Sequence, residues 1–297
     1  MSLRLSAVRF PIGHAALTAA GTAMVAIMLL TAPAAAETPK TAAEKKGWEI
    51  AREADRRNKG WGDTYTAGRM ILRDRQGDES VRDLEVKTLE GKNDIEFKSL
   101  MVFKSPPDIR GTALLTHSFN KGDDAQWLYL PALKRIKRIS ASNKSGSFMG
   151  SEFSYEDMSP AELEDYNYRY LRDETIGGLT YFVVERIPVR VESGYSKHIA
   201  WIDTAEYRTL KIDFYDRAGS RLKTLTATGF KKYLGRYWRA HKLSMTNHLN
   251  GKSTDLLWRE IKFGLGYGAR DFTRTPAGLR RRAAAAAAAA SRRPARP

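Results

Sequence analysis

Apolar and polar residues alternate along most of the chain between Thr64 and Phe263, and short turn sequences interrupt the alternation. Gly, Pro, Asn and Asp are concentrated in these interruptions, for example at 76–78, 91–94 and 106–108. A period of two places successive side chains on opposite faces of a strand, and these turn residues allow the chain to reverse. We therefore predict an antiparallel meander of about a dozen strands, at 65–74, 81–90, 95–103, 110–119, 126–130, 135–140, 167–174, 180–190, 195–203, 207–216, 222–233, 237–249 and 254–263.

A helix is expected before the first strand. Thr41 and Glu44 have the spacing of a capping box, and an apolar stripe follows them that includes Trp48 and Ile50. The predicted fold class is therefore mainly β (α+β), with a strongly curved antiparallel sheet whose apolar face has to be covered by another part of the chain. The leading helix is the natural cover. A second, short helix is predicted to begin at Pro160, with Ser159 as its N-cap.

The two ends of the chain differ from this body. Residues 1–36 combine early arginines, an apolar run and a small-residue site at 34–36, which is typical of a cleaved signal peptide. The alternative is an uncleaved anchor, but the apolar run is shorter than the ~20 residues that span a bilayer. Residues 37–276 form the predicted folded domain, and 277–297 an Arg/Ala-rich tail expected to be disordered. Secretion to the periplasm follows from the signal peptide.

Composition argues against several classes of function. The net charge of +16 includes six arginines in the tail, and secretion disfavours a nucleic acid as partner. There is no cysteine, hence no disulfide and no lipid-modified cysteine. The sequence has no nucleophile-elbow motif, nucleotide fingerprint or metal-binding His-Glu-x-x-His, so we expect no enzyme, no catalytic residue, no metal and no cofactor.

The segment 127–158 is the most distinctive in the chain. It contains Trp-Leu-Tyr-Leu-Pro at 127–131, a basic run, and Gly-Ser-Phe-Met-Gly at 146–150. In these motifs the chain resembles the outer-membrane lipoprotein-sorting (LolA-like) family of periplasmic carriers. The resemblance implies an incomplete β-barrel with a few helices over its open side, and a lid near the mouth of an acyl-binding cavity. It also implies a lipid or an acylated protein as ligand, and an association with inner-membrane transporters of the resistance-nodulation-division (RND) type.

Candidate ligand-binding residues come from the same segment. For the hydrophobic cavity or its lid they are Trp127, Tyr129, Phe148, Met149, Phe153, Tyr155 and Met158. Gly146 and Gly150 would make the Phe148–Met149 tip adaptable, as a lid requires. The alternative is that the two side chains only cap the core, because apolar loop residues are normally buried. Arg135 and Arg138 are candidates for the rim, where a lipid headgroup would lie; on a strand they fall on opposite faces.

These observations predict a monomeric periplasmic carrier that binds a hydrophobic ligand and transfers it between membranes, with peripheral membrane contact. The alternative is a periplasmic sensor that binds lipid or misfolded protein and regulates an inner-membrane signalling partner.

Overall fold

The computed structural model describes residues 41–91, 97–119 and 124–273. The predicted signal peptide and the predicted tail lie outside these ranges. In the described part, the regular elements are one α-helix, fifteen strands and five short 3-10 helices. No helix of this part is long and apolar enough to cross a membrane.

The strands follow the predicted meander, with bounds within a few residues of those expected. They are β1 (Asp63–Arg73), β2 (Glu79–Leu89), β3 (Phe97–Phe103), β4 (Ala113–Ser118), β5 (Ala125–Leu130), β6 (Arg135–Ile139), β7 (Tyr166–Ile176), β8 (Leu179–Pro188), β9 (Tyr195–Asp203), β10 (Thr209–Asp216), β11 (Arg221–Thr228), β12 (Lys231–Tyr233), β13 (Tyr237–Arg239), β14 (Lys242–Asn247) and β15 (Ser253–Phe263). The predicted strands 222–233 and 237–249 are each divided in two. Gly229 has φ of +65° at the first division, a backbone conformation that a regular strand cannot contain.

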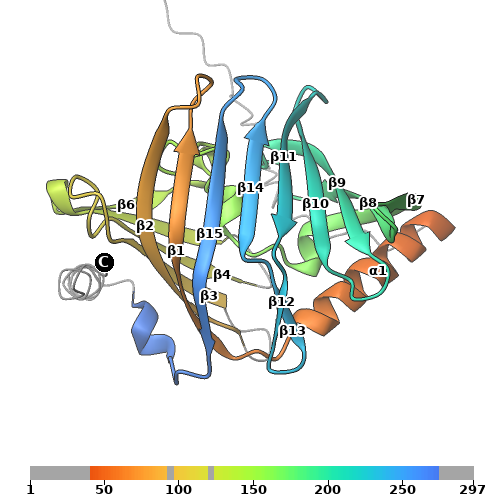
Figure 1. Ribbon diagram of the computed structural model, residues 1–297, viewed down its shortest axis with the longest axis horizontal. Helices are drawn as coiled ribbons and strands as arrows, with labels where there is room; N and C mark the ends of the chain where they lie inside the picture. The colour runs from red at the N-terminus through yellow and green to blue at the C-terminus, as the bar shows by residue number, and fades with distance from the viewer. Residues whose placement is uncertain (1–40, 92–96, 120–123, 274–297) are drawn as a thin grey trace, which may run out of the picture. The chain divides into compact units, whose positions relative to one another are not determined.

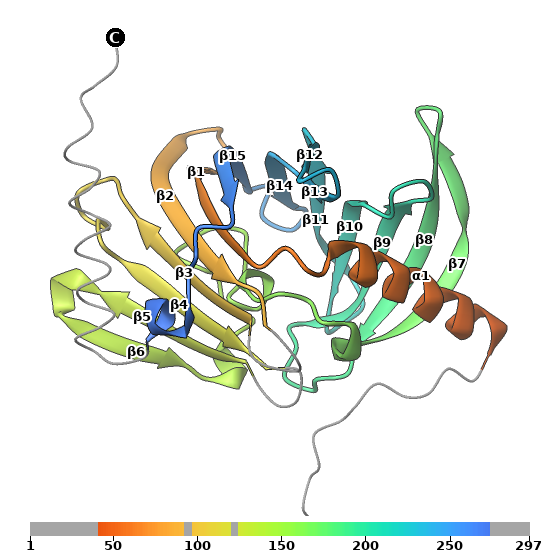
Figure 2. The same ribbon diagram turned by 90° about the horizontal axis from the view of Figure 1, so that it is seen from below.

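Thirteen of these strands form one antiparallel sheet, in the order β6-β5-β4-β3-β2-β1-β15-β14-β11-β10-β9-β8-β7, and β12 and β13 form a separate hairpin (Figure 1). The first and last strands pair in the middle of the sheet. In the described part, the edge strands β6 and β7 pair only with β5 and β8, so the sheet is not closed into a barrel. Figure 2 shows the sheet curving around a concave side. The predicted incomplete barrel is confirmed.

Helix α1 (Ala42–Asn58) covers one end of the concave side. Its predicted capping box is present: the Glu44 N–H donates to the Thr41 hydroxyl, and the Thr41 N–H donates to the Glu44 carboxylate. Ile50 is buried against Tyr168 of β7 and Val184 of β8. Figure 2 shows that the helix ends near the β12–β13 hairpin. There the Arg239 guanidinium donates to the side-chain oxygen of Asn58.

The remaining connections are 3-10 turns: η1 (Pro131–Leu133), η2 (Ala141–Asn143), η3 (Glu156–Met158), η4 (Leu163–Asp165) and η5 (Ala269–Phe272). The predicted helix beginning at Pro160 is wrong. Pro160 lies in an irregular stretch between η3 and η4. The next turn, η4, is capped by acidic residues: the Glu162 N–H donates to the carboxylate of Asp165.

Strand order also explains the path of the segment between β6 and β7. These strands are consecutive in the sequence but lie at opposite edges of the sheet. The chain from 140 to 165, which we call the crossover segment, therefore has to pass from one edge to the other. It does so over the concave side, and its aromatic side chains enter the main core.

Candidate functional site

A cavity of about 630 Å³ lies on the concave side of the sheet. Strands from both halves of the sheet, the crossover segment and the end of α1 surround it. Apolar side chains make up much of its lining, chiefly Trp61, Val86, Phe97, Met101, Phe153, Met158, Tyr166, Tyr195, Ile212, Phe214, Leu225, Trp238, Leu243, Met245, Leu256, Trp258 and Ile261. This volume falls within the ~300–1,000 Å³ range of small-molecule sites, which are also mostly apolar.

A polar row crosses one part of this lining. Thr64, Thr88 and Ser99 are cross-strand neighbours on β1, β2 and β3, and all three line the cavity. Thr116 and Gln126 continue the row onto β4 and β5. The cavity thus combines an apolar surface with a line of hydroxyl groups.

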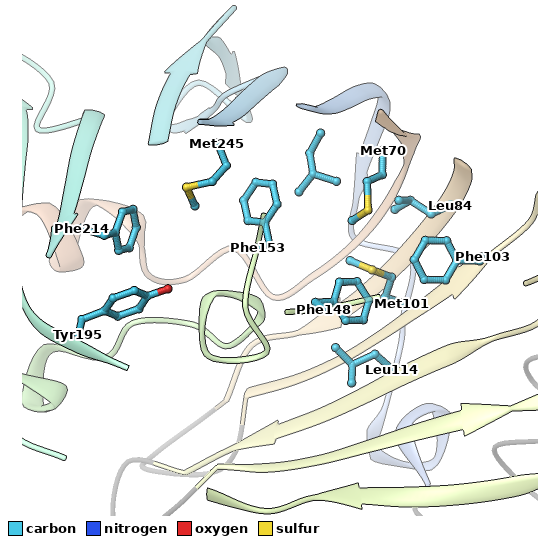
Figure 3. Close-up of a cluster of buried hydrophobic side chains, with 11 residues drawn as sticks. Met70, Leu84, Met101, Phe103, Leu114, Phe148, Phe153, Tyr195, Phe214 and Met245 are labelled. Carbon is cyan, nitrogen blue, oxygen red and sulfur yellow. The ribbon is translucent and has the colours of Figure 1, made fainter. Parts of the chain in front are cut away.

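The crossover segment is anchored inside the concave side by its aromatic residues. Figure 3 shows Phe148 beside Met101, Phe103 and Leu114, and Phe153 pointing toward Met245. The rings of Phe103 and Phe148 stack with their centroids 5.9 Å apart. Burial of aromatic side chains on this scale is a large apolar contribution to stability. The segment is therefore part of the core.

A buried ion pair fixes the same segment to the second half of the sheet. The Asp157 carboxylate lies 2.6 Å from the Lys223 ammonium, and the side chains are 7% and 5% exposed. The Tyr195 hydroxyl donates to Asp157, and Lys223 also donates to the Glu152 carbonyl. Removing one member of a buried pair typically costs ~3–5 kcal/mol, because the other charge is left without a partner.

Two of the predicted ligand-binding residues, Phe153 and Met158, line the cavity. Phe148, Met149 and Tyr155 pack in or against the cluster beside it and are not among the lining residues. Phe148 is completely buried. For Phe148, the structure thus agrees with the interpretation in which apolar loop residues are packed in the core.

Trp127 and Tyr129 lie on the other face of the sheet. They belong to a cluster with Leu115 and Phe272, which is covered by η5. The physical reason is the strand period: Gln126 and Leu128 of β5 face the concave side, so their neighbours face away. Neither Trp127 nor Tyr129 lines the cavity.

Arg135 and Arg138 lie on the edge strand β6 and are exposed. Arg138 pairs with Trp127 and Arg135 with Leu130, so the two arginines are on opposite faces, as the alternation predicts. Neither lines the cavity. The structure does not bring them together with the apolar candidates.

Three basic residues that line the cavity were missed by the sequence analysis: Arg186 on β8, His198 on β9 and Arg239 on β13. Burial lowers the pKa of the His198 imidazole well below its usual range, and the nearby Arg186 and Lys223 lower it further. Burial also lowers the pKa of the Arg239 guanidinium. Arg186 and His198 are direct cross-strand neighbours. The only signal for them in the sequence is that basic residues occupy inward-facing strand positions beside apolar ones.

A second cavity, of about 640 Å³, adjoins the first at the end of α1. Its lining is more strongly charged and includes the cations Arg56, Arg57, Arg186, Arg208, Lys232 and Arg236, against the carboxylates Asp55 and Glu206. No group of three metal-ligating side chains occurs in the ranges that the structure describes.

Comparisons with known proteins agree with this architecture. A family model with the description "-like: Uncharacterized protein" matches residues 96–276. An outer membrane lipoprotein-sorting protein domain from Vibrio parahaemolyticus has 49% identity and a TM-score of 0.77, over 80% of this chain and 99% of that one. A DUF1329 family protein from Desulfovibrio piger has 28% identity and a TM-score of 0.75, over 79% and 98%.

A LolA superfamily protein from Nitrosomonas europaea, at 22% identity and a TM-score of 0.61, shares the fold over 77% of this chain and 97% of that one. No curated protein matches the sequence. The Vibrio domain is covered almost completely and is identical at nearly half of the aligned positions, and the resemblance found in the sequence is thereby confirmed at the level of the family. The chain belongs to the outer membrane lipoprotein-sorting protein family, within the LolA-like fold.

Proposed function

We propose that the protein is a periplasmic carrier that binds the hydrocarbon part of a lipid, or the acyl chains of a lipoprotein, in the concave cavity. The observation that carries this proposal is the cavity itself, because it is mainly apolar, has the volume of a ligand site and lies between the curved sheet and the crossover segment. Each buried methylene would contribute ~0.8 kcal/mol to binding. The relative from Vibrio parahaemolyticus, described as a lipoprotein-sorting protein domain, supports the same function.

Two parts of the proposal rest on the sequence. Secretion follows from the predicted signal peptide at 1–36, and exchange of the ligand with an RND-type inner-membrane transporter follows from the family resemblance. The polar groups of the cavity serve binding and not catalysis. Among the predicted ligand residues, Phe153 and Met158 are those we assign to the cavity wall.

The test uses two neighbouring residues of β11 that face opposite sides. Leu225 lines the cavity and pairs with Met245, another lining residue, whereas Thr226 faces away. Leu225→Trp should reduce the binding of a fluorescent fatty acid about tenfold by filling the cavity, and Thr226→Trp should leave binding unchanged. Titrations of both variants and the wild type, with circular dichroism as the control for folding, measure this.

Equal binding by the two variants would show that the ligand site is not on the concave side. Absence of fatty-acid binding by the wild type, together with no lipid extracted from protein purified from its own periplasm, would contradict the carrier function.

A further inference from the structure

Four residues line both cavities: Asn58, Ala161, Arg186 and Trp238. They form a boundary between a mainly apolar space on the concave side and a strongly basic one at the end of α1. An elongated molecule that occupied both spaces would therefore need an apolar part and an anionic part. The junction between the two parts of such a molecule would lie at the boundary.

Arg186 is the charged residue of this boundary. Its Nε atom is buried without a hydrogen-bond partner, and no carboxylate in the described part of the chain forms an ion pair with its guanidinium. The guanidinium lies 5.5 Å from the centre of the Tyr166 ring, and its cross-strand neighbour His198 is also unpartnered. Arg186 as a whole is half-buried, and a partly desolvated guanidinium without a counter-charge favours the binding of an anion.

Arg239 lies next to the same boundary. It follows Trp238 in the sequence and donates to the Asn58 side chain at 2.7 Å and to the Trp238 carbonyl at 2.9 Å. Both acceptors are neutral. The Glu90 carboxylate is near enough to interact with Arg239 electrostatically, but it accepts hydrogen bonds from the Gly60 and Gly62 N–H groups and forms no ion pair with Arg239 in the described part of the chain. By contrast, Arg208 and Lys232 of the second cavity pair with Asp203 and Glu206.

We propose that Arg186, with Arg239 in the lining of the same cavity, binds the anionic headgroup of an amphiphile whose hydrocarbon tail lies in the concave cavity. The headgroup chemistry is a carboxylate or a phosphate, both of which accept paired hydrogen bonds from a guanidinium. The proposal rests on the proposed carrier function and adds the class of ligand to it. It also places the headgroup away from Arg135 and Arg138 on β6.

The experiment compares palmitate, hexadecyl phosphate and the uncharged hexadecanol, by displacement of a fluorescent fatty alcohol from the purified protein. The wild type should prefer the two anions over hexadecanol by about tenfold or more, as expected for one charge-assisted hydrogen bond. Arg186→Gln should remove the preference, because it weakens the binding of the two anions about tenfold more than the binding of hexadecanol. Arg138→Gln is the matched control, since it removes an exposed arginine on β6.

Arg186→Lys keeps the charge and should retain part of the preference, which provides a second variant if Arg186→Gln does not fold. A preference for palmitate alone, or for hexadecyl phosphate alone, identifies the headgroup as carboxylate or phosphate. The proposal is overturned if the preference survives Arg186→Gln, if Arg138→Gln abolishes it, or if the wild type binds hexadecanol equally well. If hexadecanol binds equally well, the carrier function stands and only the headgroup site is wrong. If none of the three amphiphiles binds, the carrier function and the headgroup site are both wrong.

Discussion

At the scale of single residues, His198 is the clearest case of a polar group held in an apolar setting. The imidazole is 3% exposed, lies among the rings of Tyr166, Tyr195 and Phe214, and has no hydrogen-bond partner in the described part of the chain for either ring nitrogen. The charged groups that face it, Arg186 and Lys223, are both cations. The folded protein therefore keeps this histidine neutral.

This neutrality makes stability depend on pH. Since the pKa of His198 is lowered in the folded state, the unfolded chain binds a proton near pH ~6.5 that the folded protein does not bind. The free energy of unfolding therefore has its full value above that pH. It decreases as the pH falls toward the pKa of the folded state, by at most about 1.4 kcal/mol per pH unit. His198→Phe should remove this loss, measured as the free energy of unfolding in urea between mildly acid and neutral pH.

Other titratable groups also change the unfolding free energy of the wild type with pH. The quantity to compare is therefore the difference in unfolding free energy between the wild type and His198→Phe at each pH. Burial raises the pKa values of Glu156 and Asp165, which makes the folded state more stable on acidification, opposite in sign to His198. These contributions are common to wild type and variant. Parallel curves of unfolding free energy against pH would contradict the assignment of a neutral, desolvated His198.

At the scale of elements, the sequence predicts best what is decided locally. The capping box at Thr41 and Glu44 begins α1, and the pair Gly177–Gly178, with φ of +59° and +80°, turns β7 into β8. Both features depend on a few adjacent residues. The predicted helix at Pro160 failed because its local signal competes with a crossover segment fixed by Phe148 and Phe153 in the core.

The face of a strand that lines the cavity could not be predicted for β5. Alternation correctly groups Trp127 with Tyr129 and Gln126 with Leu128, but most side chains of both groups are buried, one beneath η5 and the other beneath the crossover segment. With two covered faces, hydrophobicity does not identify the concave one. Arg186 was missed for another reason: its place at the junction of the two cavities depends on the curvature of the sheet and on residues far away in the sequence.

The packing of α1 gives a prediction that opposes helix propensity. A Cβ atom on Gly47 would lie 2.6 Å from the backbone nitrogen of Tyr170 and 2.8 Å from the backbone carbon of Arg169. Alanine is favoured over glycine inside a helix by ~1 kcal/mol, but these are backbone atoms of β7 that cannot rotate away. Gly47→Ala should therefore lower the free energy of unfolding, by ~1–3 kcal/mol, as in other overpacked sites.

Chemical denaturation monitored by circular dichroism measures this effect. Ala43→Gly, at the first turn of the same helix, is the control for propensity alone and should cost no more than ~1 kcal/mol. A stabilised Gly47→Ala variant would show that α1 is not packed on β7 as closely as the structure indicates.

At the scale of the whole domain, an unclosed sheet leaves β6 and β7 as edges. Unpaired edge strands can pair with a second molecule, and natural proteins oppose this with charged side chains. β6 carries three exposed cations, Arg135, Lys137 and Arg138, distributed over its two faces. Their distribution suits protection of an edge from either side better than recognition of a single ligand.

Replacing all three cations by valine should turn β6 into an apolar, strand-forming edge and produce dimers or larger species that increase with protein concentration. Glutamate at the same positions preserves charge on the edge, and that variant should have the same mass in solution as the wild type. Light scattering coupled to gel filtration gives the masses, and circular dichroism shows whether the sheet is intact. If the folded valine variant kept the mass of the wild type, the cations of β6 would not be what protects this edge from pairing, and a ligand-contacting role for Arg135 and Arg138 would become the better explanation of their exposure.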